Sequence, residues 1–417
     1  EEGSENEIMK YRIKMEIVKK CVGGFVLAMM IQGCQVKDHQ ELVWDVLDTP
    51  ALANSEQPFL MSEDEELYML WTEKLPEGKV SLIFSEYDKA QWRNRIELAR
   101  GEDWFVNWAD FPALSKNGRH MVAHYLEKSD TATFSYDIRL VHSSSNGTNW
   151  SQLGKLHADS VKTEHGFVSF SPGVEDSFQA VWLDGRNMEA GHHAMQLRSA
   201  EIGSDGKIVS EQLVDDMTCD CCQTSLVQTD KGTLVAYRDR TKEEIRDIYF
   251  SLFREGKWSE PKAVFNDGWK INGCPVNGPK LSSFGNSVGL AWFTGANDEP
   301  RVKVAFSDDG GINFGKPWVV DEENPLGRVD IFMLDENKAL LSWMRLNQKD
   351  AELRLALIDK LEGILISMAV TELSSARSTG FPQLEVSGGK VFLAWNQETS
   401  DGKRIKMVKK NLKEIYP

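Results

Sequence analysis

The chain has 417 residues, of which 41% are hydrophobic and 27% are charged, and its formal net charge is −16. This acidity argues against nucleic acid or an anionic membrane surface as a partner, because either would select for a basic face. The 417 − 34 = 383 residues that follow the N-terminal segment exceed what one compact core normally fills. We therefore expect two domains or an array of repeats.

The N-terminal segment from Met15 to Cys34 reads "MEIVKKCVGGFVLAMMIQGC". Two lysines, a short apolar run and a small residue before a cysteine are the order of a secretion signal, and the run is too short to span a bilayer. The ending "IQGC" resembles a bacterial lipobox, so residues 1–34 are predicted to be upstream residues plus a lipoprotein signal peptide with lipid on Cys34. A plain cleaved signal or a membrane anchor is the alternative. The expected protein is exported and membrane-anchored, in the periplasm or at the cell surface.

Seven apolar segments after residue 35 end in an aromatic residue at near-equal steps of 51 to 57 residues. Period-two alternation with turn residues between the segments predicts an array of small sheets. Four strands per unit is typical of a β-propeller blade, so residues 35–417 are expected to form one all-β propeller domain, with seven blades favoured over six. "LVWDVL", from Leu42, is predicted to close the ring as a strand of the last blade, and a monomer is expected. The aromatic positions are Trp71, Tyr125, Trp182, Tyr237, Trp292, Trp343 and Trp395.

A turn motif recurs between the outer strands of the units. "SDDGGINF", Ser307 to Phe314, matches the Asp box, Ser-x-Asp-x-Gly-x-x-Trp/Phe, and weaker copies end at Trp92, Trp150 and Trp258. In such a turn Asp309 is expected to bond backbone amides, and a glycine takes a backbone angle that other residues avoid. The domain therefore resembles the sialidase-like, BNR-repeat superfamily of propellers. "CDCCQTS" and "GCPVNGP" are similar to segments of bacterial proteins catalogued as sialidase-like. The motif indicates a fold and not an activity.

Loops that precede the inner strands of a propeller, and loops between its second and third strands, emerge on one face around the channel, which is the default binding site. Several of these loops carry arginine, whose planar fork suits carboxylate or phosphate groups. We therefore expect a small-molecule or glycan ligand, anionic in character, on that face. Internal ion pairs are the alternative for any single arginine. The candidate ligand-binding residues are Arg186, Arg238, Arg240, Arg246, Arg328, Arg377 and Asn277, and the candidate catalytic carboxylates are Asp110, Asp184 and Asp239.

The family resemblance implies sialidase chemistry, with three arginines on the substrate carboxylate, a tyrosine nucleophile paired with a glutamate, and an aspartate as acid and base. The chain departs from that pattern, because it has no "RIP" element near the first unit and no tyrosine from Phe250 to Ile415. Tyr237 lies at an aromatic core position and is expected to be packed. Hydrolysis by two carboxylates without a tyrosine remains open.

Four cysteines fall in two loops that enter neighbouring units: Cys219, Cys221 and Cys222 in one, and Cys274 in the next. Export favours disulfides, while soft sulfur ligands with an imidazole from His165 or His193 would suit copper or zinc. Disulfides, a metal site and unpaired buried thiols all remain open. Two functions follow as hypotheses: a ligand-binding propeller with glycosidase-like chemistry, or a non-catalytic lipoprotein that binds a ligand or metal through these cysteines.

Overall fold

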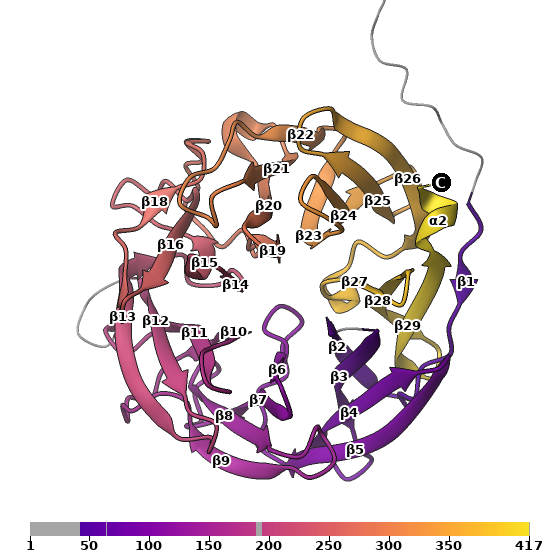
Figure 1. Cartoon of the computed structure of the whole chain (residues 1–417). Helices are drawn as coiled ribbons and strands as arrows, with labels where there is room; N and C mark the ends of the chain where they lie inside the picture. The colour runs from indigo at the N-terminus through magenta and orange to yellow at the C-terminus, as the bar shows by residue number, and fades with distance from the viewer. Residues whose placement is uncertain (1–41, 64, 189–193, 417) are drawn as a thin grey trace, which may run out of the picture. The chain divides into compact units, whose positions relative to one another are not determined.

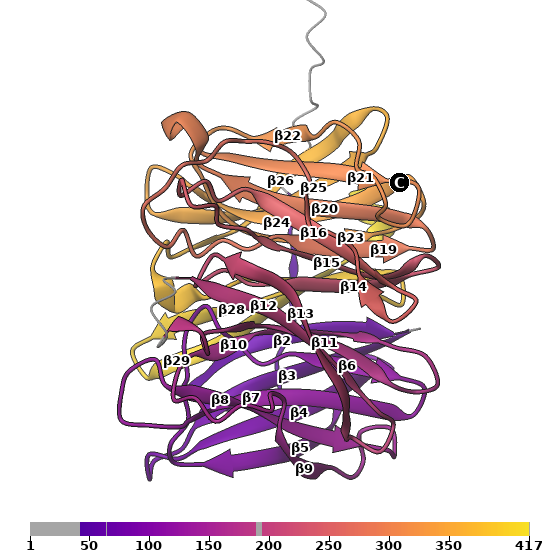
Figure 2. The ribbon, with the colours of Figure 1, turned by 90° about the vertical axis from the view of Figure 1, so that its left-hand side faces the viewer.

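A computed structural model describes residues 42–63, 65–188 and 194–416. They form seven antiparallel sheets set around a common centre (Figure 1). The expected seven-bladed, all-β propeller is thereby confirmed. In a side view the strands run through the thickness of the ring, from one face to the other (Figure 2).

The first four blades follow the order of the chain. They comprise β2 (Ser55–Glu63), β3 (Glu66–Lys74), β4 (Val80–Asp88) and β5 (Gln91–Gly101); β6 (Leu114–Asn117), β7 (His120–Lys128), β8 (Tyr136–Ser143) and β9 (Ser151–Lys155); β10 (His165–Pro172), β11 (Phe178–Asp184), β12 (Met195–Ile202) and β13 (Ile208–Thr218); and β14 (Ser225–Thr229), β15 (Gly232–Arg238), β16 (Ile248–Arg254) and β17 (Lys257–Trp258), with β18 (Lys262–Ala263) also paired to β16.

The remaining blades complete the ring. They comprise β19 (Lys280–Phe284), β20 (Ser287–Thr294), β21 (Arg301–Ser307) and β22 (Trp318–Asp321); β23 (Pro325–Met333), β24 (Lys338–Leu346), β25 (Ala351–Asp359) and β26 (Gly363–Leu373); and β27 (Gln383–Ser387), β28 (Lys390–Thr399) and β29 (Gly402–Asn411) with β1 (Asp45–Val46). The described helices are short: η2 (Ala296–Asp298), η3 (Arg377–Thr379) and α2 (Leu412–Ile415). Among the residues described, no helix has the length and apolar character needed to cross a membrane.

The seventh blade joins both ends of the described chain. Strand β1 pairs antiparallel with β29, with Asp45 opposite Lys409 and Val46 opposite Val408. This is the closure predicted for the segment from Leu42. Because β1 supplies the outer strand of the blade, the edge of β29 is paired over these residues and is not left open.

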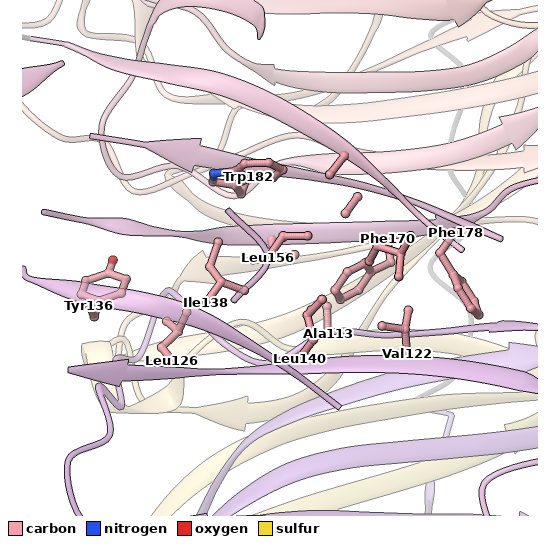
Figure 3. Packing of buried hydrophobic residues seen from close by; sticks show 14 residues of the cluster. Ala113, Val122, Leu126, Tyr136, Ile138, Leu140, Leu156, Phe170, Phe178 and Trp182 are labelled. Atoms are coloured by element: carbon pink, nitrogen blue, oxygen red, sulfur yellow. The ribbon is translucent and has the colours of Figure 1, made fainter. Parts of the chain in front are cut away.

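The core lies between neighbouring blades. The repeated aromatic residue lies within the second strand of each blade and is buried in every one, and Trp71, Trp182 and Trp343 have no exposed surface. Figure 3 shows one such layer, in which Trp182 and Phe170 of the third blade pack with Ile138 of the second. The repeat seen in the sequence is therefore a packing repeat, because each blade buries one face against the next.

The turn from Ser307 to Phe314 has the geometry expected of an Asp box. Asp309 Oδ1 accepts hydrogen bonds from the Asn313 backbone N–H at 2.9 Å and from Ser307 Oγ at 2.8 Å. Gly310 has a φ of 74°, in the left-handed region that favours glycine. Phe314 packs edge-on against Phe250 of the preceding blade, with ring centroids 5.1 Å apart. The motif therefore ties adjacent sheets together.

Candidate functional site

One mouth of the channel is closed by residues 107–111, called the plug below. Gln57, at the start of β2, donates through Nε2 to the carbonyls of Asn107 at 2.6 Å and Asp110 at 3.0 Å. Gln223, which precedes β14, donates through Nε2 to the Ala109 carbonyl at 2.7 Å. The plug precedes β6 of the second blade yet contacts the first and fourth blades, so it crosses the centre of the ring (Figure 1).

Aromatic contacts hold the plug from the opposite side. The Trp108 ring stacks on Phe381, which precedes β27, with centroids 5.6 Å apart. The guanidinium carbon of Arg328, in β23, lies 5.0 Å from the centre of the Trp108 ring, a cation–π arrangement. Together with Gln57 and Gln223, these contacts tie the plug to the first, fourth, sixth and seventh blades. The mouth that the plug closes belongs to the face expected to hold the site.

A cavity of about 440 Å³ occupies the channel beyond the plug. Residues from the inner strands of all seven blades line it, among them Phe59, Phe170 and Phe332. At the far ends of these strands the lining residue Gln228 is exposed, and the Glu63 side chain retains 35% of its surface. The cavity is therefore approached from the face opposite the plug, called the open face below.

The charged groups of the cavity are mostly carboxyls. Glu385, in β27, accepts a hydrogen bond from Ser62 Oγ at 2.7 Å, and burial raises its pKa to about 8. Burial also raises the pKa of Asp330, in β23, whose Oδ2 accepts from the Leu384 backbone N–H at 2.9 Å. Lys280 Nζ lies 4.0 Å from Asp330. At neutral pH the cavity therefore holds a protonated carboxyl beside a carboxyl–lysine pair.

Asp110 lies where the plug meets the cavity and belongs to a chain of three acidic groups. Its Oδ1 accepts from the Phe167 backbone N–H at 2.8 Å, and its Oδ2 contacts the Tyr136 hydroxyl at 3.1 Å. The same hydroxyl contacts Glu164 Oε1 at 2.7 Å. Burial raises the pKa of Asp110 to about 8 and that of Glu164 to about 7. One hydroxyl proton cannot serve two carboxylates, so this geometry requires at least one protonated carboxyl.

The other two candidate carboxylates occupy different surroundings. Asp184 is fully buried and accepts from Trp182 Nε1 and from Arg186 through both Nε and Nη2, at 2.7–2.8 Å. Burial acts to raise its pKa, but the hydrogen bonds from Arg186 prevail and hold it below its usual value. Burial, followed by the charge of Asp215, raises the pKa of Asp239 to about 7. Asp184 is engaged in an ion pair, and Asp239 follows β15 beside other acidic groups.

Most of the candidate arginines are used inside the protein. Arg238 donates to the carbonyls of Asn277, Arg246 and Phe293, and Arg328 donates to those of Ser375, Ala376 and Gly380. Both side chains are buried, and burial lowers the pKa of Arg328 to about 10. Because these guanidiniums already satisfy backbone carbonyls that would otherwise lack partners, they brace loops and do not face solvent.

The remaining candidates on this face are also paired, with one exception. Arg186 contacts Asp184, Asp159 and Glu211; Arg240 contacts Asp220 and Glu244; Arg246 contacts Glu244 and Cys219; and the Asn277 side chain bonds the Leu326 carbonyl and the Arg328 backbone N–H. Arg377 is exposed and lies 5.8 Å from the Trp108 ring centre, with no ion pair among the described residues. The arginine set is therefore mainly the internal network that the sequence left as the alternative, and it does not form an open anion site.

The four cysteines come together on the plugged face as free thiols. The Sγ atoms of Cys219, Cys221 and Cys222 all lie within 4.8 Å of one another, and Cys274 is within hydrogen-bonding reach of Cys221. Cys219 and Cys222 are 3.5 Å apart, too far for a disulfide. Hydrogen bonds from Cys221 and Cys222, with the charges of Arg238 and Arg246, hold the pKa of Cys219 well below its usual value. In this structure the cysteines are unpaired, and the choice between disulfides, a metal site and free thiols stays a prediction.

The imidazole expected to join these thiols lies elsewhere. The His165 ring stacks on His157 with centroids 3.7 Å apart, and Asp159 contacts both rings, at 2.8 Å from His157 and 3.2 Å from His165. His165 is thus part of a buried histidine–carboxylate network and forms no metal-ligand group with the cysteines in the described part of the chain. His193 and Cys34 lie outside the described residues.

Several groups of this region escaped the sequence analysis: Trp108, Tyr136, Lys280 and Glu385. Tyr136 was hidden because it begins a third strand and not a loop. Glu385 left a usable signal, since a glutamate inside the inner strand "QLEVS" is unexpected in a buried segment. No signal in the sequence revealed that Trp108 crosses the channel.

No protein-family model and no curated protein matches the chain. Among solved structures, the chain is similar to a polysaccharide lyase, with a TM-score of 0.52 and 9% identity over 91% of this chain and 94% of that one. It is also similar to a mutant α-L-arabinofuranosidase of Fusarium graminearum bound to an iminosugar inhibitor, with a TM-score of 0.50 and 11% identity over 90% and 98% of the two chains. At such identities the likeness shows a shared propeller fold and nothing finer.

Proposed function

We propose that the propeller binds a neutral sugar in its channel cavity and that the sugar enters from the open face. The observation that carries the proposal is the cavity itself, whose lining combines Phe59, Phe170 and Phe332 with a protonated carboxyl and serine residues. Its volume of about 440 Å³ is in the range of small-ligand pockets. Sugars present C–H faces that pack on aromatic rings and hydroxyls that need hydrogen-bond partners, so both kinds of lining are used.

The charge balance of the cavity argues for a neutral ligand. Its two lysines, Lys116 and Lys280, already face Glu63 and Asp330. No cation among its described lining residues is left to receive a substrate carboxylate. We therefore replace the anionic ligand expected from the sequence, and with it sialidase specificity, by an uncharged one.

Glycoside hydrolysis is a second candidate, and the position of Glu385 favours it. Glycosidases generally need one protonated carboxyl as a general acid and a second carboxyl as nucleophile or base. Glu385 is protonated at neutral pH, and Asp330 lies on the neighbouring blade in the same cavity. In this mechanism Glu385 gives its proton to the leaving oxygen, and Asp330 acts on the anomeric carbon directly or through a water.

The test is calorimetric titration of the full chain with a panel of neutral pentose and hexose disaccharides. Binding is expected to at least one of them and to weaken about tenfold in Phe332→Ala, which removes a ring from the cavity wall. Arg377→Ala, on the plugged face, is the matched control and should bind as the wild type does. Absence of binding to every sugar, or loss in Arg377→Ala with none in Phe332→Ala, would contradict the channel site.

The same variants separate binding from hydrolysis. Glu385→Gln keeps an uncharged hydrogen-bonding group of the same size, so sugar binding at pH 7 should stay within about threefold. Hydrolysis should disappear, because the amide has no acidic proton to donate. Full hydrolysis by Glu385→Gln would remove Glu385 from the mechanism. The signal-like segment of residues 15–34 makes export part of this proposal, on sequence grounds alone.

A further inference from the structure

The four thiols of the plugged face have no place in sugar binding, yet they converge from two blades. Cys219, Cys221 and Cys222 lie between β13 and β14, and Cys274 lies between β18 and β19. A hydrogen bond joins the two cysteine-bearing loops: Gln223, directly after Cys222, accepts the Gly278 backbone N–H through Oε1 at 3.0 Å. The two cysteine loops are therefore held in fixed positions by the fold.

The distances between the sulfur atoms fit shared ligation better than covalent pairing. A disulfide needs about 2.05 Å between sulfurs. Four thiolates about 2.3 Å from a tetrahedral ion are separated from one another by about 3.8 Å. The observed 3.5 Å between Cys219 and Cys222 lies close to the second value. All three sulfurs of Cys219, Cys221 and Cys222 lie within 4.8 Å of one another, which leaves room for a shared ion.

Two arginines provide the charge that a thiolate cluster requires. Arg246 Nη1 donates to Cys219 Sγ at 3.2 Å, and Arg238 also acts electrostatically on Cys219. The Arg246 side chain is only 3% exposed, and its Nε is buried without a hydrogen-bond partner among the described residues. A buried guanidinium with one N–H on sulfur and another unpartnered indicates an environment able to hold more negative charge than one thiolate supplies.

We infer that this cluster is a binding site for a thiophilic d¹⁰ metal ion, Zn²⁺ or Cu⁺. Four thiolates with Zn²⁺, or three with Cu⁺, each carry a net charge of −2, which Arg238 and Arg246 offset in part, since Arg246 also pairs with Glu244. Cys219, Cys221 and Cys222 form the base of the site in both cases. Zinc would take a fourth ligand from the exposed Cys274, which neighbours Cys221 but lies outside the group of three. Sulfur-only ligation selects these ions over Mg²⁺, Ca²⁺ or Mn²⁺.

The inference is tested by metal titration of the reduced full chain, with Co²⁺ as an optical probe for zinc and Cu⁺ in parallel under anaerobic conditions. One equivalent is expected to bind and to protect three or four thiols from a thiol reagent. Co²⁺ should give an intense thiolate charge-transfer band. Cys219→Ser and Cys222→Ser should weaken binding about 100-fold or more, because each removes a ligand common to both ions. Arg377→Ala is the matched control and should bind normally.

Cys274→Ser distinguishes the two ions: it should abolish tetrahedral cobalt and zinc binding and spare Cu⁺. Thermal denaturation of each metal-free variant checks that the propeller is folded. The inference is overturned if the reduced wild type binds neither ion stoichiometrically, or if folded Cys219→Ser and Cys222→Ser bind as tightly as the wild type. Sugar titration of the same samples is independent, because the cavity lies on the other side of the plug.

Discussion

Replacing Asp110 by asparagine should change how the stability of the propeller depends on pH. Asp110 is 2% exposed, and its pKa of about 8 lies well above its unfolded value of about 4. The folded chain therefore keeps a proton between these pH values that the unfolded chain loses. Stability from this group is fully present below pH 4 and is lost as pH rises towards 8.

The size of this pH effect on the free energy of unfolding follows from the single proton that the folded chain keeps. Where the folded state binds one more proton than the unfolded state, the free energy of unfolding falls by about 1.4 kcal/mol per pH unit. Between pH 5.5 and 7.5 the free energy of unfolding should therefore fall by about 3 kcal/mol more in the wild type than in Asp110→Asn. Asparagine preserves the acceptor for the Phe167 N–H, and its amide can donate to the Tyr136 hydroxyl. The variant should remain folded and become the more stable protein at alkaline pH.

The assay is urea denaturation at half-unit pH steps, with unfolding followed by tryptophan fluorescence. Asp184→Asn is the contrasting variant. Its carboxylate is ionised in both folded and unfolded states across this window, because its folded pKa is lowered. The free energy of unfolding of Asp184→Asn should therefore lie below that of the wild type by the same amount at every pH in this window. Parallel curves for the wild type and Asp110→Asn would refute the assignment of a protonated Asp110.

Two further outcomes concern the turn and the plug. Asp309→Ala should lower the free energy of unfolding by about 1 kcal/mol, because the hydrogen bonds to Asn313 and Ser307 are lost. Its sugar affinity should stay unchanged. A folded variant with impaired sugar binding would contradict a purely structural role for Asp309. Trp108→Ala should lower the free energy of unfolding by about 2 kcal/mol, which is less than a full core truncation because the ring is only half-buried. The same variant should exchange its backbone amide hydrogens faster across residues 107–111. Unchanged protection in hydrogen-exchange mass spectrometry would show that Trp108 does not secure the plug.

The parts of the fold that repeat locally could be predicted from sequence. The spacing of residues such as Trp182 and Trp343 predicted seven blades, and Asp309 marked a turn, because each depends on contacts within one or two neighbouring strands. The alternation around Leu42 also predicted the closing strand. These features reflect periodicity, which a single sequence displays.

The site was harder to predict because it depends on contacts between distant loops. An arginine on a loop looks the same in sequence whether it meets a ligand or, like Arg238 and Arg328, a backbone carbonyl of another blade. The closed mouth depends on Trp108 meeting Phe381, which is 381 − 108 = 273 positions away. The sequence predicts that the cysteines of two neighbouring loops lie close together, but it does not reveal that the His165 ring turns towards His157.

The two-residue strand β1 also bears on how the molecule folds. Val46 meets Val408, so the ring is completed by residues 408 − 46 = 362 positions apart. The first six blades are each made from consecutive strands and can form as local meanders, whereas the seventh needs both ends at once. We therefore expect ring closure to be a late step of folding, slowed by its loop-closure entropy. Until it occurs, the long strand β29 presents an unpaired edge, so we expect crowded folding conditions to favour pairing between chains at the seventh blade.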